Sequence, residues 1–321
     1  MEPEDNETRE LRHLSDSRQR RQGADELISL LPLETRHDRS YAYWASKQLE
    51  PLSAWWWKPL SSAVMGTVTT ATSLLLHLGF RRVITDDLHK LTDIVEDPLR
   101  DRPVITIANH ESAMDDPVMW GMLPARMRWR PSTMRWTLGA RELLYRGPVS
   151  NAFFALGQTI PTVRGDGIYQ LAVEIALQRL AENQWLHVFP EGRVNQTDRL
   201  LRLKWGVGRM VMESERTPVV IPMIIRGMRE VLPMYQPIPL PRPNPFSSVF
   251  YMRVGDPIDF AEQLAQWRAA REKLATDDER DALDEAVRIA IVDRMWDSLD
   301  KLKSDSTRAA AAAGLLPKAP L

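Results

Sequence analysis

The stretch ANHESAMDDP, at residues 108–117, decides the fold, because it links an apolar strand to a helix through a run of polar side chains. Residues 104–108 have the sequence VITIA, which predicts a buried strand, and Pro117 suits the first position of a helix. Asp116 then suits the N-cap, since the residue before a proline favours an extended backbone. Asp115 falls just outside that helix, where a strand-to-helix turn allows it to meet His110.

An imidazole held by a carboxylate is a general base that works at neutral pH, so His110 and Asp115 predict activation of a hydroxyl group. The carboxylate fixes the tautomer of the imidazole, as it does in serine hydrolases, and here the substrate is expected to supply the hydroxyl. Two plainer interpretations stay open, a structural histidine at a strand end and a simple Asp-Pro helix cap. A zinc site is not expected, because Met114 stands where a zinc-protease helix carries its second histidine.

Two further motifs follow expected strands. FPEGRVN, at residues 189–195, ends one strand and places Glu191 and Arg193 at a turn. GQTIPTVRGDG, at residues 157–167, puts Arg164 between a strand and a helix expected to begin near Asp166, where a guanidinium and helix N–H groups grip a phosphate. A plain turn and a surface ion pair are the alternatives. If the strands are parallel, the three motifs converge on one rim.

The alternation of short apolar runs with longer helical patterns predicts an α/β fold, with a mostly parallel central sheet flanked by helices. Residues 86–303 are expected to form a single domain, between a polar arm at 1–54, a membrane anchor at 55–85 and a flexible tail at 304–321. The proline-rich stretch at 232–245 predicts no regular element. Strands are expected at 104–108, 159–163, 185–189, 219–225 and 249–254. Helices are expected at 117–123, 139–145, 166–181, 204–215, 260–275 and 279–303.

The anchor prediction depends on three tryptophans at residues 55–57, followed by a stretch to Phe80 whose only charge is at Lys58. Arg81 and Arg82 then close the stretch, and tryptophans and basic residues typically flank a segment at a membrane interface. Serines and threonines dilute its apolar content, which favours an interfacial or re-entrant anchor over a full span. A buried helix of a soluble protein is the alternative that remains open.

Composition excludes several classes of protein. The 321 residues carry a net charge of −1, which argues against wholesale binding of nucleic acid, although residues 121–210 hold thirteen basic against six acidic side chains. The absence of cysteine excludes disulfides, thiolate nucleophiles and zinc-thiolate sites. The sequence lacks a G-x-S-x-G elbow and a P-loop, so serine-hydrolase and nucleotide-binding sites lose support, and no metal or cofactor is expected.

In this order the motifs resemble the H-x4-D glycerolipid acyltransferases, with a likeness that covers roughly residues 57–260. Residues 110–115 match the first block of that family, 157–164 the second, 189–192 the third and 220–222 the fourth. Finer features, among them NHESAMDDPVMWG and WLHVFPEGRVN, are similar to the branch of the family that remodels cardiolipin.

The resemblance implies a transacylase that moves acyl chains between phospholipids and lysophospholipids, cardiolipin and monolysocardiolipin above all, without coenzyme A, a cofactor or an acyl-enzyme. His110 is then the base and Asp115 orients it, while the other expected residues bind the acceptor lipid. These substrate-binding residues are Asn109, Arg164, Glu191, Gly192 and Arg193. The donors to the developing oxyanion stay unassigned, and backbone amides near Gly192 are one candidate.

The same resemblance implies a mitochondrial protein, peripheral or monotopic on the inner and outer membranes, which faces the intermembrane space. It leaves a homo-oligomer open. Two alternatives also remain. One is an acyltransferase that uses acyl-coenzyme A to acylate lysophosphatidate or another lysophospholipid. The other is a mitochondrial lipid-binding protein without activity.

Overall fold

The computed structural model describes residues 44, 48, 55–234 and 240–312, with side chains described up to residue 308. The predicted arm at 1–54 therefore lies outside the described residues, except for Trp44 and Gln48. The last nine residues of the predicted tail, 313–321, lie outside them as well.

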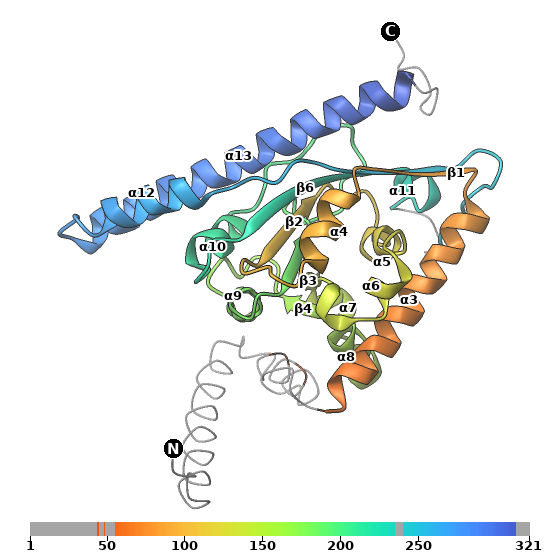
Figure 1. Ribbon diagram of the computed structural model, residues 1–321, viewed down its shortest axis with the longest axis horizontal. Helices are drawn as coiled ribbons and strands as arrows, with labels where there is room; N and C mark the ends of the chain where they lie inside the picture. The colour runs from red at the N-terminus through yellow and green to blue at the C-terminus, as the bar shows by residue number, and fades with distance from the viewer. Residues whose placement is uncertain (1–43, 45–47, 49–54, 235–239, 313–321) are drawn as a thin grey trace, which may run out of the picture.

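Seven strands form one sheet, in the order β1-β7-β6-β2-β5-β3-β4 (Figure 1). Strand β2 lies near the middle and pairs in parallel with β5 and β6, and β3 pairs in parallel with both β4 and β5. Strand β7 runs antiparallel to β6 and parallel to β1, so the predicted mostly parallel sheet is confirmed. The strands are β1 (Arg82–Asp86), β2 (Val104–Ala108), β3 (Trp136–Ala140), β4 (Thr159–Thr162), β5 (Trp185–Val188), β6 (Val219–Arg226) and β7 (Val249–Val254).

Helices cover both faces of the sheet (Figure 1). The longest, α13, runs along one side of the sheet, and α3 runs along the opposite side of the domain. The first group of helices is α3 (Trp57–Gly79), α4 (His89–Glu96), α5 (Asp115–Trp120), α6 (Ala125–Arg128), the 3-10 helix η2 (Pro131–Thr133), α7 (Arg141–Leu144) and α8 (Pro148–Leu156). The second group is α9 (Leu171–Ala181), α10 (Gly206–Glu213), α11 (Met228–Val231), α12 (Ala261–Arg271) and α13 (Asp277–Ala312).

Strand β2 shows why the sheet needs helices on both faces. Its five residues are all buried, and successive side chains of a strand point to opposite faces. Ile105 and Ile107 belong to the core that α9, α10 and α13 cover, whereas Val104 and Ala108 belong to the core beneath α4 and α5. The continuous apolar run is therefore typical of a central parallel strand, and it ends where the polar segment at 109–114 begins.

Residues 136–140 differ from the prediction. The helix expected at 139–145 is instead the end of strand β3 followed by the single turn α7. Trp136 is fully buried and pairs with Leu186 of β5, while Thr137 pairs with Thr159 of β4. These cross-strand partners are distant in sequence, so the local pattern could not reveal them.

Two helix starts also differ from the prediction. Helix α9 begins at Leu171 rather than near Asp166, because Gly165 and Gly167 adopt left-handed backbone angles with φ of 88° and 78°. The side chain of Gln170 stabilises this turn through bonds with Val163 and Gly167. The first residue of the helix is thus seven residues beyond Arg164, the arginine that it was expected to assist.

Helix α5 begins at Asp115, so Asp116 is not its N-cap and Pro117 is not its first residue. The N-cap is Met114, whose side chain makes no capping bond. The two aspartates are used elsewhere, because Asp115 binds the loop before the helix and Asp116 binds Arg135 and Trp120.

The expected anchor at 55–85 is divided between two elements. Helix α3 is long and apolar enough to cross a membrane, by length and composition, and it packs along α5, α6 and α8. After Gly79 the chain turns, and residues 82–86 form β1, which pairs with β7 at the edge of the sheet.

Candidate active site

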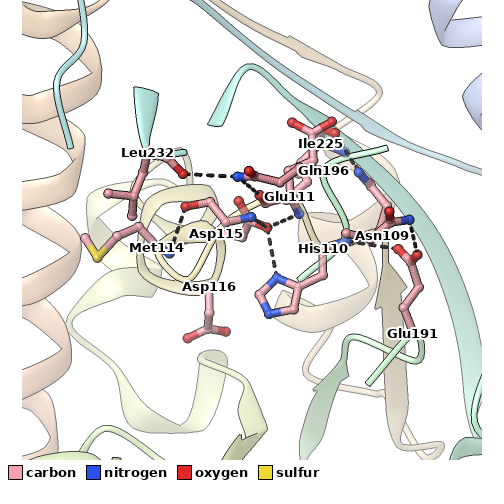
Figure 2. A network of polar contacts seen from close by, with 12 residues as sticks. Asn109, His110, Glu111, Met114, Asp115, Asp116, Glu191, Gln196, Ile225 and Leu232 are labelled. Carbon is pink, nitrogen blue, oxygen red and sulfur yellow. Dashed lines mark hydrogen bonds and ion pairs between the residues drawn. The ribbon is translucent and has the colours of Figure 1, made fainter. Parts of the chain in front are cut away.

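The imidazole of His110 and the carboxylate of Asp115 meet at the carboxyl end of β2, as predicted (Figure 2). Nδ1 of His110 lies 2.9 Å from Oδ2 of Asp115, so in the neutral imidazole the proton on Nδ1 is donated to the carboxylate. The second ring nitrogen, Nε2, makes no hydrogen bond within the described residues, and the side chain keeps 19% of its surface exposed. This is the arrangement that a general base needs.

Asp115 is held by the loop that it follows. Its Oδ2 atom also accepts the backbone N–H groups of Glu111, at 2.6 Å, and Ser112, at 2.7 Å. The side chain is fully buried, and Oδ1 has no hydrogen-bond partner among the residues that the structure describes. Burial raises the pKa of Asp115, while the hydrogen bonds from His110 and the backbone oppose that rise. The carboxylate is thereby fixed in position at the base of the loop.

Aromatic rings set the plane of the imidazole. His110 stacks on Phe189, with ring centroids 4.1 Å apart and an angle of 15° between the planes. Phe189 in turn contacts His187 edge to face, at 4.5 Å. His187 is fully buried and burial lowers its pKa to about 3, so this second histidine is neutral, and its Nδ1 atom is hydrogen-bonded to the hydroxyl of Thr106 at 2.8 Å. Phe189 thus restricts His110 to rotations in its own plane, a role that the sequence did not reveal.

Two of the residues expected to bind substrate are buried and bind the protein instead. Asn109 exchanges two hydrogen bonds with the backbone of Ile225, both at 2.9 Å, and so fastens β2 to β6. Glu191 is 2% exposed and accepts the backbone N–H of His110 at 3.2 Å. Its other oxygen accepts hydrogen bonds from Asn195 and from the backbone of Leu201. These contacts favour a positioning role for both residues.

Gly192 lies at the surface in a left-handed conformation, with φ of 71°, which disfavours any other residue there. Its backbone N–H donates to the carbonyl oxygen of Phe189 at 3.0 Å. This bond closes the turn of the motif and already engages the Gly192 amide, which is one candidate for an oxyanion donor.

The two arginines of the predicted site do not contact His110. Arg164 follows the edge strand β4, which is separated from β2 by β5 and β3, so about 14 Å of sheet lies between the two strand ends. Its guanidinium is 52% exposed and pairs with Glu142 at 3.3 Å. Arg193 is exposed on the loop after Gly192. Both lie on segments that leave the carboxyl edge of the parallel strands, as the convergence argument predicted.

The sequence did not predict one further ion pair near the site. Arg135 is almost fully buried and binds both carboxylate oxygens of Asp116, and its Nη1 also donates to the carbonyl of Gly157. Burial raises the pKa of Asp116, but the Arg135 charge and hydrogen bonds outweigh it and lower that pKa overall. The pair joins the start of α5 to the end of α8. The only feature of the sequence that could have indicated this pair is the second acid, Asp116, directly after Asp115.

Comparison with known proteins agrees with the geometry. A family model described as Acyltransferase matches residues 87–226. The chain is 44% identical over 170 residues to a Dictyostelium discoideum protein named Taffazin, and the aligned region covers 51% of this chain and 59% of that protein. It is 33% identical over 216 residues to the Drosophila melanogaster protein named Tafazzin, and the aligned region covers 67% of this chain and 56% of that protein.

A third relative has a different name. The N-acylphosphatidylethanolamine synthase of Arabidopsis thaliana is 43% identical over 164 residues, which cover 49% of this chain and 56% of that protein. The chain thus spans less than two thirds of the length of each of these relatives. The Acyltransferase match over residues 87–226 and the relatives named tafazzin agree with the resemblance drawn from the motifs: this part of the chain is an acyltransferase domain.

Proposed function

We propose that this chain is a transacylase that moves fatty acyl chains from a phospholipid to a lysophospholipid without coenzyme A, with cardiolipin and monolysocardiolipin among its substrates. The single observation that carries the proposal is the His110–Asp115 pair, whose Nε2 atom is left for a substrate hydroxyl. The relatives named tafazzin support the choice of acyl transfer over other uses of such a pair.

In the proposed reaction, Nε2 of His110 removes the proton from a glycerol hydroxyl of the lysophospholipid. The oxygen attacks the ester carbonyl of the donor, and Asp115 stabilises the imidazolium that forms. When the tetrahedral intermediate collapses, the C–O bond to the donor's glycerol breaks and that oxygen takes the proton back from Nε2. Ester and alcohol are exchanged, and nothing is oxidised or reduced.

Binding contributes more than the base in this scheme. A positioned base is worth about 10²- to 10⁴-fold in rate. Holding two lipids and the base in a reactive geometry is worth about 7 to 11 kcal/mol. Arg164 and Arg193 are the proposed contacts for the phosphate of the acceptor, because both are exposed at the rim where the parallel strands end.

The decisive experiment is mass spectrometry of monolysocardiolipin incubated with the purified protein and a phospholipid of distinct acyl composition. Acyl chains are expected to move without coenzyme A. Transfer only after addition of acyl-coenzyme A would show the thioester-dependent alternative. Lipid binding with no acyl exchange in either condition would show the alternative without activity.

The Arabidopsis relative favours a second candidate, transfer of the acyl group to the amine of phosphatidylethanolamine. The same base can remove a proton from an ammonium group, so the geometry of His110 accommodates either acceptor. Mild alkaline hydrolysis of the products separates the two, since it cleaves esters and leaves amides intact. An alkali-resistant acylated product from phosphatidylethanolamine would establish the amine as an acceptor.

The proposal includes a membrane location for α3, because its outer face exposes leucine side chains while its inner face buries hydroxyl groups as well as apolar side chains. Its inner face buries hydroxyl groups that find partners in the domain, among them Ser61 on the carbonyl of Leu156 and Thr72 on the carbonyl of Pro117. Its outer face exposes Leu74 by 56% and Leu78 by 75%. A helix that turns its leucines outward suits an apolar surrounding, and this one is proposed to lie in the membrane interface.

Exchange of both exposed leucines, Leu74→Glu with Leu78→Glu, is expected to abolish binding to phospholipid vesicles in a flotation assay. Each buried leucine side chain is worth about 1.5 to 3 kcal/mol, so the pair accounts for a loss of at least about 100-fold in partitioning. Leu99→Glu is the matched control, since Leu99 is 86% exposed in the loop before β2. Vesicle binding that survives the double exchange would contradict the proposed location of α3.

The proposal also includes a mitochondrial location on membranes that face the intermembrane space, as the resemblance of the motifs implies. Subcellular fractionation with protease protection of intact and outer-membrane-ruptured mitochondria tests it. Recovery of the protein from another membrane would contradict the mitochondrial location and leave the proposed acyl transfer untouched.

A further inference from the structure

Glu111 lies between the proposed base and its carboxylate in the sequence, and it makes contacts that the reaction scheme does not explain. The backbone N–H of Glu111 donates to Asp115 at 2.6 Å, and its carbonyl oxygen accepts from the side chain of Gln196 at 2.9 Å (Figure 2). Its own carboxylate turns away from solvent and accepts the backbone N–H of Gly227 at 3.1 Å. Glu111 therefore connects the catalytic loop to two segments more than 80 residues away in sequence.

The partner of that carboxylate is a rigid point. Gly227 follows β6 directly and has φ of 100°, a left-handed conformation. A Cβ atom there would lie 1.9 Å from the carbonyl oxygen of Val249, so only glycine fits against β7. A hydrogen bond to this amide fastens the catalytic loop to the central sheet rather than to a mobile surface segment.

The carboxyl of Glu111 also lies among other charges. Burial raises its pKa to about 7, and the negative charges of Asp115 and Glu230 add to this effect. The positive charges of Arg229 and Arg226 oppose it. The charged groups that face Glu111 are Asp115 of α5, Arg226 of β6, Arg229 and Glu230 of α11 and Lys303 of α13.

We infer that Glu111 is a positioning residue for the general base: its carboxyl holds the loop between His110 and Asp115 against Gly227, and its negative charge favours the imidazolium that forms on His110. The inference rests on the proposed acyl transfer. It assigns two separable contributions to one side chain, a hydrogen bond that a neutral side chain can replace and a charge that it cannot.

The test compares wild type, Glu111→Gln and Glu111→Ala in the acyl-exchange assay, with kcat and KM measured from pH 5.5 to 8.5. Glutamine keeps an oxygen for the Gly227 amide and loses the charge. At pH 5.5, where the wild-type carboxyl is protonated, the kcat of Glu111→Gln is expected to match that of wild type. At pH 8.5 its kcat is expected to be about threefold to tenfold lower, with unchanged KM. Alanine loses both contributions and is expected to be slower at every pH.

The pH dependence of stability reports the protonation of the Glu111 carboxyl independently of activity. Because the folded pKa of Glu111 exceeds that of a free glutamate, the folded protein loses stability as pH rises from about 4.5 to about 7. Glu111→Gln is neutral throughout, so its Tm is expected to exceed that of wild type above pH 7 and to approach it below pH 5. A variant that is more stable and yet slower at high pH is the expected signature.

Glu215→Gln, at an exposed position after α10, is the control for removal of one negative charge. An active wild type whose pH profile coincides with that of Glu111→Gln would overturn the inference and leave the proposed function intact. A wild type with no acyl exchange under any condition would instead overturn the proposed function. If Glu111→Ala fails to fold, the glutamine variant still decides between these outcomes.

Discussion

Replacement of His110 by alanine is expected to lower kcat for acyl exchange by about 10²- to 10⁴-fold, the usual contribution of a positioned general base. KM for the lysophospholipid is expected to change little, since the imidazole acts on a proton and the lipid is held elsewhere. The measurement is the initial rate of transfer of labelled acyl chains between purified lipids, at saturating acceptor.

His89→Ala is the matched control, because His89 is exposed at the start of α4, outside the site. The His110 ring is partly exposed and its removal leaves the backbone bonds to Glu191 and Asn195 in place, so the fold is expected to persist. Acyl exchange by His110→Ala at close to the wild-type rate would reject His110 as the base.

Replacement of Asp115 by asparagine is expected to cost a similar factor, about 10²- to 10⁴-fold in kcat, although the change is nearly isosteric. Oδ2 alone accepts Nδ1–H of His110 and the backbone N–H groups of Glu111 and Ser112. If the amide oxygen takes this place, the hydrogen bonds remain but the negative charge that stabilises the imidazolium is lost. If the NH2 group takes it, the imidazole proton moves to Nε2, and the nitrogen that should take the substrate's proton is no longer free.

The effect of Asp115→Asn should appear in kcat rather than in lipid binding, which vesicle flotation measures separately. Asp93→Asn, at an exposed position of α4, controls for the loss of one carboxylate. A variant with kcat within about threefold of wild type would show that His110 does not depend on this partner for its tautomer.

The site illustrates how a buried acid can act on catalysis without reaching the substrate. Glu191 binds the backbone of His110 on one side and Asn195 with Leu201 on the other, so one carboxylate joins the catalytic loop to the FPEGRVN turn. Asn195 completes the connection, since its backbone N–H donates to the carbonyl of His110 at 2.6 Å. Conversion of Glu191 to alanine would leave the donors of His110, Asn195 and Leu201 without this acceptor.

The local sequence was sufficient for the features that depend on neighbouring residues. The span of β2 was predicted as Val104–Ala108 because a short run of mainly apolar residues, four of five, ends at a polar turn. His110 and Asp115 are five residues apart on that turn, so their meeting required no knowledge of the rest of the chain. The order of apolar strands and helices likewise determined the parallel α/β fold.

Other features were decided only when distant segments packed together. The direction in which Glu191 points depends on an amide 81 residues away, and the carboxylate of Glu111 depends on an amide 116 residues away. Helix α3 has polar and apolar faces in its sequence, but only packing against Leu156 and Pro117 determines which face turns inward.

The sequence by itself thus determined the fold class, the acyltransferase motifs and the pair of groups that forms the proposed base. The tertiary structure decided which acids brace that pair, where β3 and α9 begin, and which face of α3 remains exposed. The physical reason is the range of the interactions. Apolar periodicity and turn chemistry act over a few residues, whereas the hydrogen-bond partners of buried polar groups come from whichever segments the folded sheet brings together.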